Sequence, residues 1–489
     1  MTGTGSAAAP ATGLACAGCG HRVPDDAPLA FACPAARPGD DVDHVLVRLL
    51  DPAVARRPPD PAAANPFARW RHRFHAYHRA RALGWSDARY LRLVDRLDAR
   101  LVRVGDRPFR VTPFRRADAL SDALGFTAAG GVWVKDETGN VSGSHKARHL
   151  AGTLLEIEVE EARTGRRGGR GRPALAIASC GNAALAAAVV ARAAERRLDV
   201  FIPTDADPVV VDRLQALGAN LAVCEREPGV AGDPTYHALL RAIRGGAIPF
   251  TCQGNLNGLA IEGGATLGWE LAAAIGAPGG PARLDRVVVQ VGGGALLSSV
   301  AAGLAEGAGG DGAAPGTPLP RIHAVQPASV HPLARAFERV RARVAAGEPL
   351  ADALADAARH RSAYMWPWEA EPHSVAHGII DDETYDWRAC LEALLASGGG
   401  PLVVAEATLG EANALARSTT GIDVDPTGSS GLAGLLDLVR ARAVRPDETI
   451  ALLFTGAVRR PPTPAPGDHL VQRAAHPRPH SPFADSGGH

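Results

Sequence analysis

Hydrophobic residues alternate between two patterns in the central part of the chain. Short apolar runs such as ALAIA, LDVFIP and NLAVC, at residues 174–178, 198–203 and 220–224, are typical of buried strands. AALAAAVVARAAE and VVVDRLQALG, which lie between these runs, have the length and spacing of helices. RVVVQV, RIHAVQ and TIALLF continue the series, and a helix is predicted to begin at Leu296. Such repeated strand–helix–strand units predict an α/β fold with a mostly parallel sheet covered on both faces.

The first part of the chain follows a different pattern. Residues 66–105 predict two amphipathic helices broken at Gly84, and FRVTPF after them predicts a strand. WRHRFHAYHR interleaves basic and aromatic residues, which at helical spacing favours a packed extension over a nucleic-acid surface. We therefore expect a ribbon-like cysteine segment (1–45), a helical extension (46–108), an α/β catalytic domain (109–460) and a disordered tail (461–489).

Composition and charge narrow the choice of partner. Lysine plus arginine and aspartate plus glutamate number 52 each, so no net field would attract nucleic acid or an anionic membrane. No apolar stretch approaches the roughly 20 residues of a spanning helix, and the N-terminus lacks a leader pattern, which predicts a cytoplasmic protein. Seven cysteines without framework spacing predict reduced thiols. A small molecule is therefore the expected partner.

The cysteine segment contains part of a zinc ribbon. Cys16 and Cys19 form a C-x-x-C pair and Cys33 follows, but Ala36 stands where a second pair would end. A zinc ion would need a fourth ligand, for which the candidates are Asp40, Asp41, His44 and His21. The alternative is a degenerate ribbon that keeps its turn without metal.

One lysine lies where a helix is predicted to begin. In VKDETGNVSGSHKARHL, apolar residues recur at helical spacing, and Ser142 and Ser144 are natural N-caps, so Lys146 falls in the first turn. A cation there gains nothing from the helix dipole, which favours anions. This stretch alone leaves an exposed surface lysine as an equal alternative. Lys135, the other lysine of the chain, is expected to be structural or near the surface.

A loop after the ALAIA strand could bind a carboxylate. It consists of Ser179, Cys180, Gly181 and Asn182, and it joins a strand to a helix. Such a turn presents backbone N–H groups and a helix N-terminus, to which Asn182 adds an amide donor. We expect this loop to contact the substrate.

Two further loops follow predicted strands, at the edge where α/β sheets bind ligands. The first consists of Gly292, Gly293, Gly294, Ala295 and Leu296, and its glycines let the backbone close around an anion. A tight turn is one alternative, and a dinucleotide fingerprint is disfavoured because Leu297 stands where its third glycine belongs. The second loop contains Thr455, which ends the TIALLF strand with one hydroxyl.

In this order the motifs resemble those of the fold type II pyridoxal phosphate enzymes. That family includes threonine synthase, serine and threonine dehydratases, diaminopropionate ammonia-lyase and the tryptophan synthase beta subunit. SGSHKAR resembles its lysine motif, SCGN its cofactor-contacting loop, GGGAL its phosphate loop, and FTGA the motif that bonds the pyridine nitrogen. The resemblance covers about residues 110–460. The N-terminal cysteines add a likeness to threonine synthases.

The resemblance implies a two-lobed fold whose smaller lobe spans roughly residues 147–250, and a homodimer. It implies pyridoxal phosphate held covalently by Lys146 and contacted by Asn182, the loop from Gly292 to Leu296, and Thr455. Lys146 would also move protons at the alpha carbon of a small amino-acid substrate. Cys180 is a second candidate for proton transfer, against the alternative of an inert buried thiol.

The implied reaction is elimination or replacement at the beta or gamma carbon, of the threonine synthase type. One alternative is a dehydratase or a diaminopropionate-type ammonia-lyase, which would release ammonia and an oxo acid. The alternative of another class is a non-catalytic descendant that binds a partner. The segment HSVAHGIIDDETYDW, at residues 373–387, matches none of the four motifs.

Overall fold

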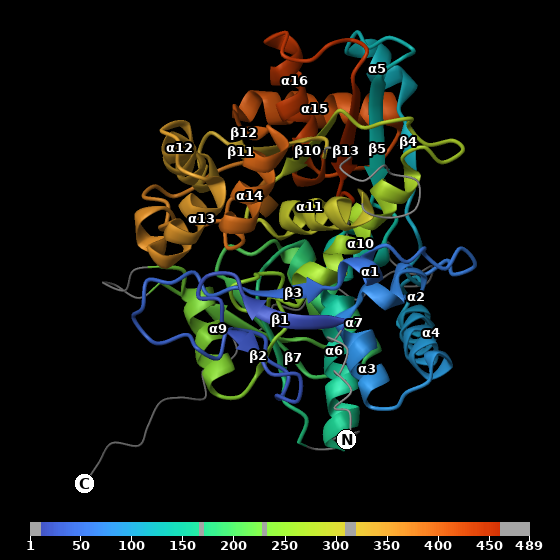
Figure 1. The fold of residues 1–489 in the computed structure, drawn as a ribbon, viewed down its shortest axis with the longest axis vertical. Coiled ribbons are helices and arrows are strands. Elements are labelled where there is room, and N and C mark those ends of the chain that lie inside the picture. Colours follow the sequence, from blue (N-terminus) through green and yellow to red (C-terminus); the bar gives the residue numbers. More distant parts are fainter. Residues whose placement is uncertain (1–10, 166–170, 227–231, 309–318, 460–489) are drawn as a thin grey trace, which may run out of the picture. The chain divides into compact units, whose positions relative to one another are not determined.

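A six-stranded sheet forms the core of one lobe (Figure 1). The computed structural model describes residues 11–165, 171–226, 232–308 and 319–459, so the predicted tail lies outside the described residues. In sheet order the strands are β12 (Gly400–Val404), β11 (Arg321–Pro327), β10 (Arg286–Gln290), β13 (Thr449–Phe454), β5 (Gly131–Asp136) and β4 (Phe114–Arg116). All neighbours pair in parallel except β4 and β5. The predicted parallel α/β sheet is thereby confirmed. β5 and β12 escape the sequence analysis because charged residues or a Gly-Pro pair interrupt their apolar runs.

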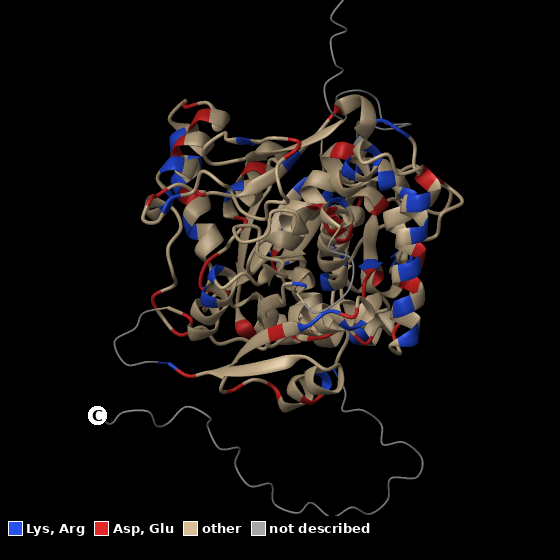
Figure 2. Cartoon of the chain, turned by 90° about the horizontal axis from the view of Figure 1, so that it is seen from below, with Lys and Arg blue, Asp and Glu red and all other residues tan. Residues whose placement is uncertain are grey.

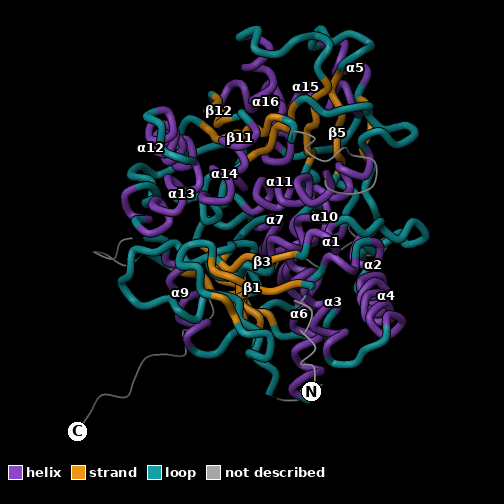
Figure 3. The backbone as a smooth tube through the Cα atoms, in the orientation of Figure 1, coloured by secondary structure: helices purple, strands orange, loops and turns teal. Residues whose placement is uncertain are grey.

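Both faces of this sheet are buried, because successive side chains of a strand point to opposite faces. Val287 and Val289 of β10 belong to one hydrophobic cluster, and Val288 belongs to another. Helices cover the two faces (Figure 3). The first cluster includes residues of α11 (Ala295–Ala308), α12 (Pro332–Ala345), α13 (Leu350–Arg359) and α14 (Trp387–Ser397). The second includes residues of α5 (Asp118–Ala123), α15 (Glu406–Thr420) and α16 (Pro426–Arg440).

A four-stranded parallel sheet forms a second lobe. Its strands, in sheet order, are β8 (Asn220–Cys224), β7 (Leu198–Pro203), β6 (Leu175–Ala178) and β9 (Ile248–Pro249). The accompanying helices are α6 (Lys146–Thr164), α7 (Asn182–Ala193), α8 (Pro208–Ala216) and α9 (Pro234–Arg244). α10 (Ala260–Ala274) packs against both α6 and α11 and so joins the two lobes.

The helical extension packs on the second lobe. It comprises α1 (Pro52–Ala55), α2 (Pro66–Arg69), η1 (Arg71–Arg73), α3 (His75–Ala82) and α4 (Asp87–Arg103). Phe67, Trp70 and Phe74 are at most 2% exposed and share a core with α6 and α7, so the packed extension is what the aromatic pattern encodes. The break at Gly84, with a φ of +75°, is confirmed.

One expectation for the extension and one for the residues that follow it are wrong. The first predicted helix is divided into α2, η1 and α3, because Trp70 and Phe74 leave the helical conformation where their rings turn into the core. The strand predicted over FRVTPF begins only at Phe114. The Phe109 ring instead packs 5.0 Å from that of Phe67, and its N–H donates to Asp98.

The N-terminal segment forms a small antiparallel sheet in the order β2 (Arg22–Val23), β1 (Thr12–Cys16) and β3 (Leu46–Leu50). Within the described ranges, every helix is too short or too polar to cross a bilayer. Figure 2 shows basic and acidic residues interspersed over the ribbon, as the balanced composition predicts.

Candidate functional site

Lys146 is the first residue of α6, as the helical spacing predicts. The predicted serine caps are wrong: His145 occupies the cap position, and no side chain bonds the first turn. Ser142 has a left-handed φ of +57° within η2 (Val141–Gly143), and Ser144 pairs with Gly456 in an isolated bridge. These local conformations leave the buried Ser144 hydroxyl without a partner in the described structure.

Lys146 is half-buried, and its amine makes no hydrogen bond or ion pair with any described residue. Two imidazoles lie near it in the sequence, that of His145 at the cap position and that of His149 in α6, with ring centroids 5.7 Å apart. Burial, reinforced by the Lys146 charge, lowers the pKa of His149 to about 3 and that of His145 well below its usual value. Both rings are therefore neutral near pH 7.

The SCGN loop reaches the end of the large sheet. Ser179 follows β6, and Asn182 begins α7. The Asn182 amide donates to Asp425 at 3.3 Å, and a side-chain carbon at Gly456 would lie 2.6 Å from that amide nitrogen. A glycine is therefore needed where the FTGA segment passes the loop. Cys180 is half-buried and packs against the core of the second lobe.

Thr455 lies at the end of β13, 2% exposed. Its hydroxyl oxygen accepts a hydrogen bond from the Gln290 side-chain amide at 2.7 Å. Its carbonyl accepts from the His145 N–H at 3.1 Å. Because its oxygen already accepts, the Thr455 proton is available to donate. Gln290 was missed by sequence reasoning, since a glutamine ending a strand carries no distinctive signal.

The glycine loop joins β10 to α11 and is tightly covered. A side-chain carbon at Gly292 would lie 2.2 Å from an Asp381 carboxylate oxygen and 2.8 Å from the Ile379 Cα. At Gly293 such a carbon would lie 2.9 Å from the Tyr385 ring. The covering residues belong to HSVAHGIIDDETYDW, which no sequence motif identified. We call residues 379–386 the covering segment.

The covering segment brings buried acids to the site. Burial raises the pKa of Asp381 to about 6 and that of Asp386 to about 8. Asp381 accepts a hydrogen bond from the Gly293 N–H, and Asp386 from the Gly254 N–H at 3.4 Å. The Lys146 charge acts on both carboxyl groups, so this side of the lysine is acidic.

A buried charge cluster fixes the start of α6. Its members are Lys135, Glu137, Arg148 and Glu270, each at most 4% exposed. Arg148 donates to Glu137 at 2.8 Å and to Glu270 at 2.6 Å, and Lys135 pairs with Glu270. Lys135 is therefore structural, but it lies in the interior rather than near the surface. The cluster ties α6 to β5 and α10 two residues beyond Lys146.

A cavity of about 550 Å³ lies elsewhere, between α4, α7 and the end of α8. Four arginines line it: Arg100, Arg103, Arg192 and Arg196. None of the predicted site residues lines this cavity. The site is therefore defined by the convergence of its chemical groups and not by this cavity.

Comparison with known proteins agrees with this convergence. Residues 106–456 match the model of a family described as pyridoxal-phosphate dependent enzyme. The chain belongs to this family. A serine dehydratase-like protein of Mus musculus is 34% identical over 208 residues, which are 42% of this chain and 55% of the relative. A cysteate synthase of Methanospirillum hungatei is 28% identical over 147 residues, 29% of this chain and 30% of the relative. The chain thus matches about half the length of its serine dehydratase-like relative.

Solved structures show the same fold. Maize serine racemase superposes with a TM-score of 0.52 and 18% identity, covering 74% of this chain and 93% of that one. A threonine deaminase from Solanum lycopersicum gives a TM-score of 0.52 and 18% identity, covering 76% of this chain and 91% of that one. These similarities confirm the fold type II architecture of the pyridoxal-phosphate family.

The site residues fit the family's cofactor. Lys146 supplies an amine without a hydrogen-bonding partner among the described residues. The loop from Gly292 to Gly294 is a cradle that side chains would fill, with Gly294 at a φ of +93°. Thr455 supplies a proton donor from the neighbouring strand. Parallel β10 and β13 end at the same edge, which brings these groups together.

Proposed function

We propose that this chain binds pyridoxal phosphate through Lys146 and catalyses elimination at the beta carbon of a small amino acid, releasing ammonia and an oxo acid. The observation that carries the proposal is the Lys146 amine, which has no hydrogen-bond or ion-pair partner among the described residues and whose charge acts on two neutral imidazoles and on the Asp381 carboxyl that covers the glycine loop. The names of the serine dehydratase-like relatives support the reaction class.

The proposed roles follow from position and chemistry. When bound, pyridoxal phosphate supplies an electron sink for the bond-breaking at the substrate's alpha carbon. The Lys146 amine would hold the cofactor and then move the alpha proton, because the lowered pKa values of the neighbouring imidazoles make them poor proton acceptors. The glycine loop would hold the phosphate, and Thr455 would donate to the pyridine nitrogen. A hydroxyl there, in place of a carboxylate, leaves that nitrogen largely unprotonated.

The loop from Ser179 to Asn182 is proposed to bind the substrate carboxylate. It precedes α7, whose first-turn N–H groups and partial positive charge favour an anion. Asn182, held toward Asp425, adds a side-chain amide. The carboxylate would then be oriented on the second lobe, while the cofactor rests on the large sheet.

The covering segment does not select the charge of the substrate side chain. At pH 7 Asp386, with a pKa of about 8, is largely neutral, and Asp381 lies beside the loop that is proposed to hold the cofactor phosphate. The names of the serine dehydratase-like relatives favour a hydroxy-acid as the substrate. The second candidate is a replacement reaction of the threonine synthase type, which the likeness to a cysteate synthase and the N-terminal cysteines favour.

Cofactor attachment and reaction can be tested separately. Borohydride reduction and peptide mapping should place the label on Lys146 and leave Lys135 unmodified; a label on Lys135, or none, contradicts the assignment. Serine, threonine, 2,3-diaminopropionate and O-phosphohomoserine are then compared by the change in cofactor absorption and by released ammonia and oxo acid. Lys146→Ala should abolish turnover. Formation of a new amino acid without ammonia release would instead support the replacement reaction.

A further inference from the structure

The cysteine segment contains a cluster that the proposed function does not use. The sulfurs of Cys16, Cys19 and Cys33 and a ring nitrogen of His44 all lie within 4.8 Å of one another. All seven cysteines of the chain are free thiols, so no disulfide accounts for this convergence. We propose that these four side chains bind one zinc ion, with His44 as the fourth ligand.

Two ligand–ligand distances in the cluster have the lengths expected for a zinc tetrahedron. With Zn–S bonds of about 2.3 Å and Zn–N bonds of about 2.0 Å, its S–S edges are about 3.8 Å and its S–N edges about 3.5 Å. The Cys19 and Cys33 sulfurs are 3.7 Å apart, and the Cys16 sulfur is 3.5 Å from Nδ1 of His44. Both distances match without rearrangement. Four protein ligands leave no open position, so the site is structural rather than catalytic.

The surrounding backbone and side chains hold the ligands in place. The Cys19 N–H points to the Cys16 sulfur at 3.5 Å, and Gly20 closes the turn with a φ of +75°. Nε2 of His44 lies 3.1 Å from the Asp40 carboxylate, which turns Nδ1 toward the sulfurs. Such a carboxylate behind a histidine is typical of zinc sites. Asp40 therefore orients the ligand and is not itself one.

A bound metal would stabilise this segment, because the segment has a small hydrophobic core of its own. The buried residues of its cluster are Cys16, Cys33 and Leu46, two of which are proposed ligands. Small modules with so little apolar burial usually depend on a metal or disulfides. Apolar packing alone does not explain why three thiols converge at the end of β1.

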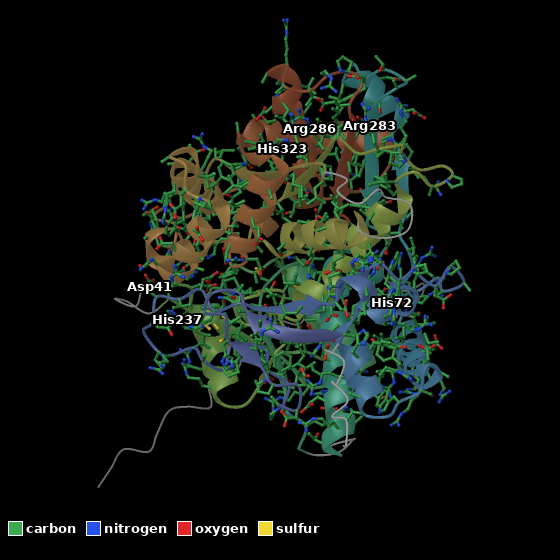
Figure 4. The ribbon with its side chains drawn as sticks, in the orientation of Figure 1. Asp41, His72, His237, Arg283, Arg286 and His323 are labelled. Atoms are coloured by element: carbon green, nitrogen blue, oxygen red, sulfur yellow. The ribbon has the colours of Figure 1, made fainter. Side chains whose placement is uncertain are left out.

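The ligand-bearing loop also connects to the glycine loop. The Asp41 carboxylate accepts from the Ser362 N–H at 2.8 Å, beside the end of α13 (Figure 4), and Asp43 lies 3.4 Å from Arg361. Arg361 in turn pairs with Glu383 of the covering segment. The Asp386 N–H donates to the Gly293 carbonyl at 3.0 Å. We therefore expect the zinc site to support the covering segment through Arg361. The consequence for cofactor binding rests on the proposed function.

Metal content provides the direct test. Protein purified without chelator should contain one zinc ion per chain, and cobalt-substituted protein should show the visible bands of tetrahedral thiolate ligation. Cys33→Ser and His44→Gln should lose most of the metal. The control variants Cys224→Ser and His360→Gln should keep the metal. His360 pairs with Asp356 at the same i, i+4 spacing that joins His44 to Asp40, but it lies outside the cluster.

The outcomes separate the parts of the proposal. Wild-type protein without zinc or cobalt uptake, or with a Cys19–Cys33 disulfide under reducing conditions, overturns the site. Full zinc content in His44→Gln overturns the assignment of His44 as the fourth ligand. If a variant fails to fold, cobalt titration of chelator-stripped wild-type protein still tests whether the cluster binds a metal ion. Stripping should weaken pyridoxal phosphate binding about five- to tenfold. An unchanged affinity overturns the link through Arg361, whereas zinc-loaded protein that never binds cofactor contradicts the proposed function.

Discussion

Lys135→Met tests the buried charge cluster that anchors the start of α6. Lys135 is 1% exposed, donates to the Thr112 carbonyl at 2.7 Å and pairs with Glu270. Burial lowers the pKa of Lys135, and the carboxylates of Glu270 and Glu137 act against that effect. Methionine preserves the volume but removes the charge. Breaking a buried ion pair costs about 3–5 kcal/mol of unfolding free energy, because the remaining charge is left without compensation.

The expected cost lies at the lower end of that range. Glu270 keeps its bond to Arg148 at 2.6 Å, so it loses one of its two cations. We therefore expect Lys135→Met to lower the free energy of unfolding by about 3 kcal/mol. Glu270→Gln should be similarly destabilising, and the double variant should cost about 2 kcal/mol less than the sum of the single ones. Covalent cofactor attachment at Lys146 should survive in the folded variants.

Equilibrium urea denaturation at pH 7, followed by tryptophan fluorescence, measures these changes. The matched control is Arg440→Met, which breaks an exposed pair with Glu411 and should cost less than about 1 kcal/mol. If Lys135→Met costs no more than Arg440→Met, the cluster is not desolvated. The anchoring of α6 by this cluster would then be refuted.

Three further predictions concern the site. Gly292→Ala should sharply reduce pyridoxal phosphate affinity, because the added carbon would lie 2.8 Å from the Ile379 Cα. The control Gly410→Ala, whose added carbon would have nothing within 4 Å, should leave the affinity unchanged, and equal affinities in the two variants would contradict the phosphate cradle. Burial raises the pKa of Asp386 to about 8, so the stability that its protonated form contributes at low pH is lost as the pH rises toward 8. In a denaturation series, the unfolding free energy of Asp386→Asn should therefore fall less steeply between pH 4 and 8 than that of the wild type, and an equal slope would contradict the burial of Asp386. Cys180→Ala should reduce turnover by about two orders of magnitude if its thiol carries a proton, and normal turnover would leave Lys146 to act alone.

The sequence by itself determined the elements whose signals are local. The apolar runs of β6, β7, β10, β11 and β13 lie where the periodicity predicts, because buried parallel strands require apolar residues. NLAVC also forms a strand, β8, but it lies at the edge of its sheet and is largely exposed. The glycine loop is equally local, since only glycine tolerates so close an approach of the backbone. Lys146 could be placed at a helix start from spacing alone. The order of the motifs then predicted its role in holding the cofactor.

The tertiary structure decided which distant groups meet. The covering segment lies about 90 residues after the glycine loop, and no local pattern says that Asp381 would lie against Gly292. Lys135 reads as an ordinary charged residue until Glu270, 135 positions away, is placed beside it. His44 was one of four candidate ligands, and its distance to the Cys16 sulfur singles it out. Local propensity fixes short-range conformation, whereas these contacts depend on how the sheets and helices pack, which no window of neighbouring residues encodes.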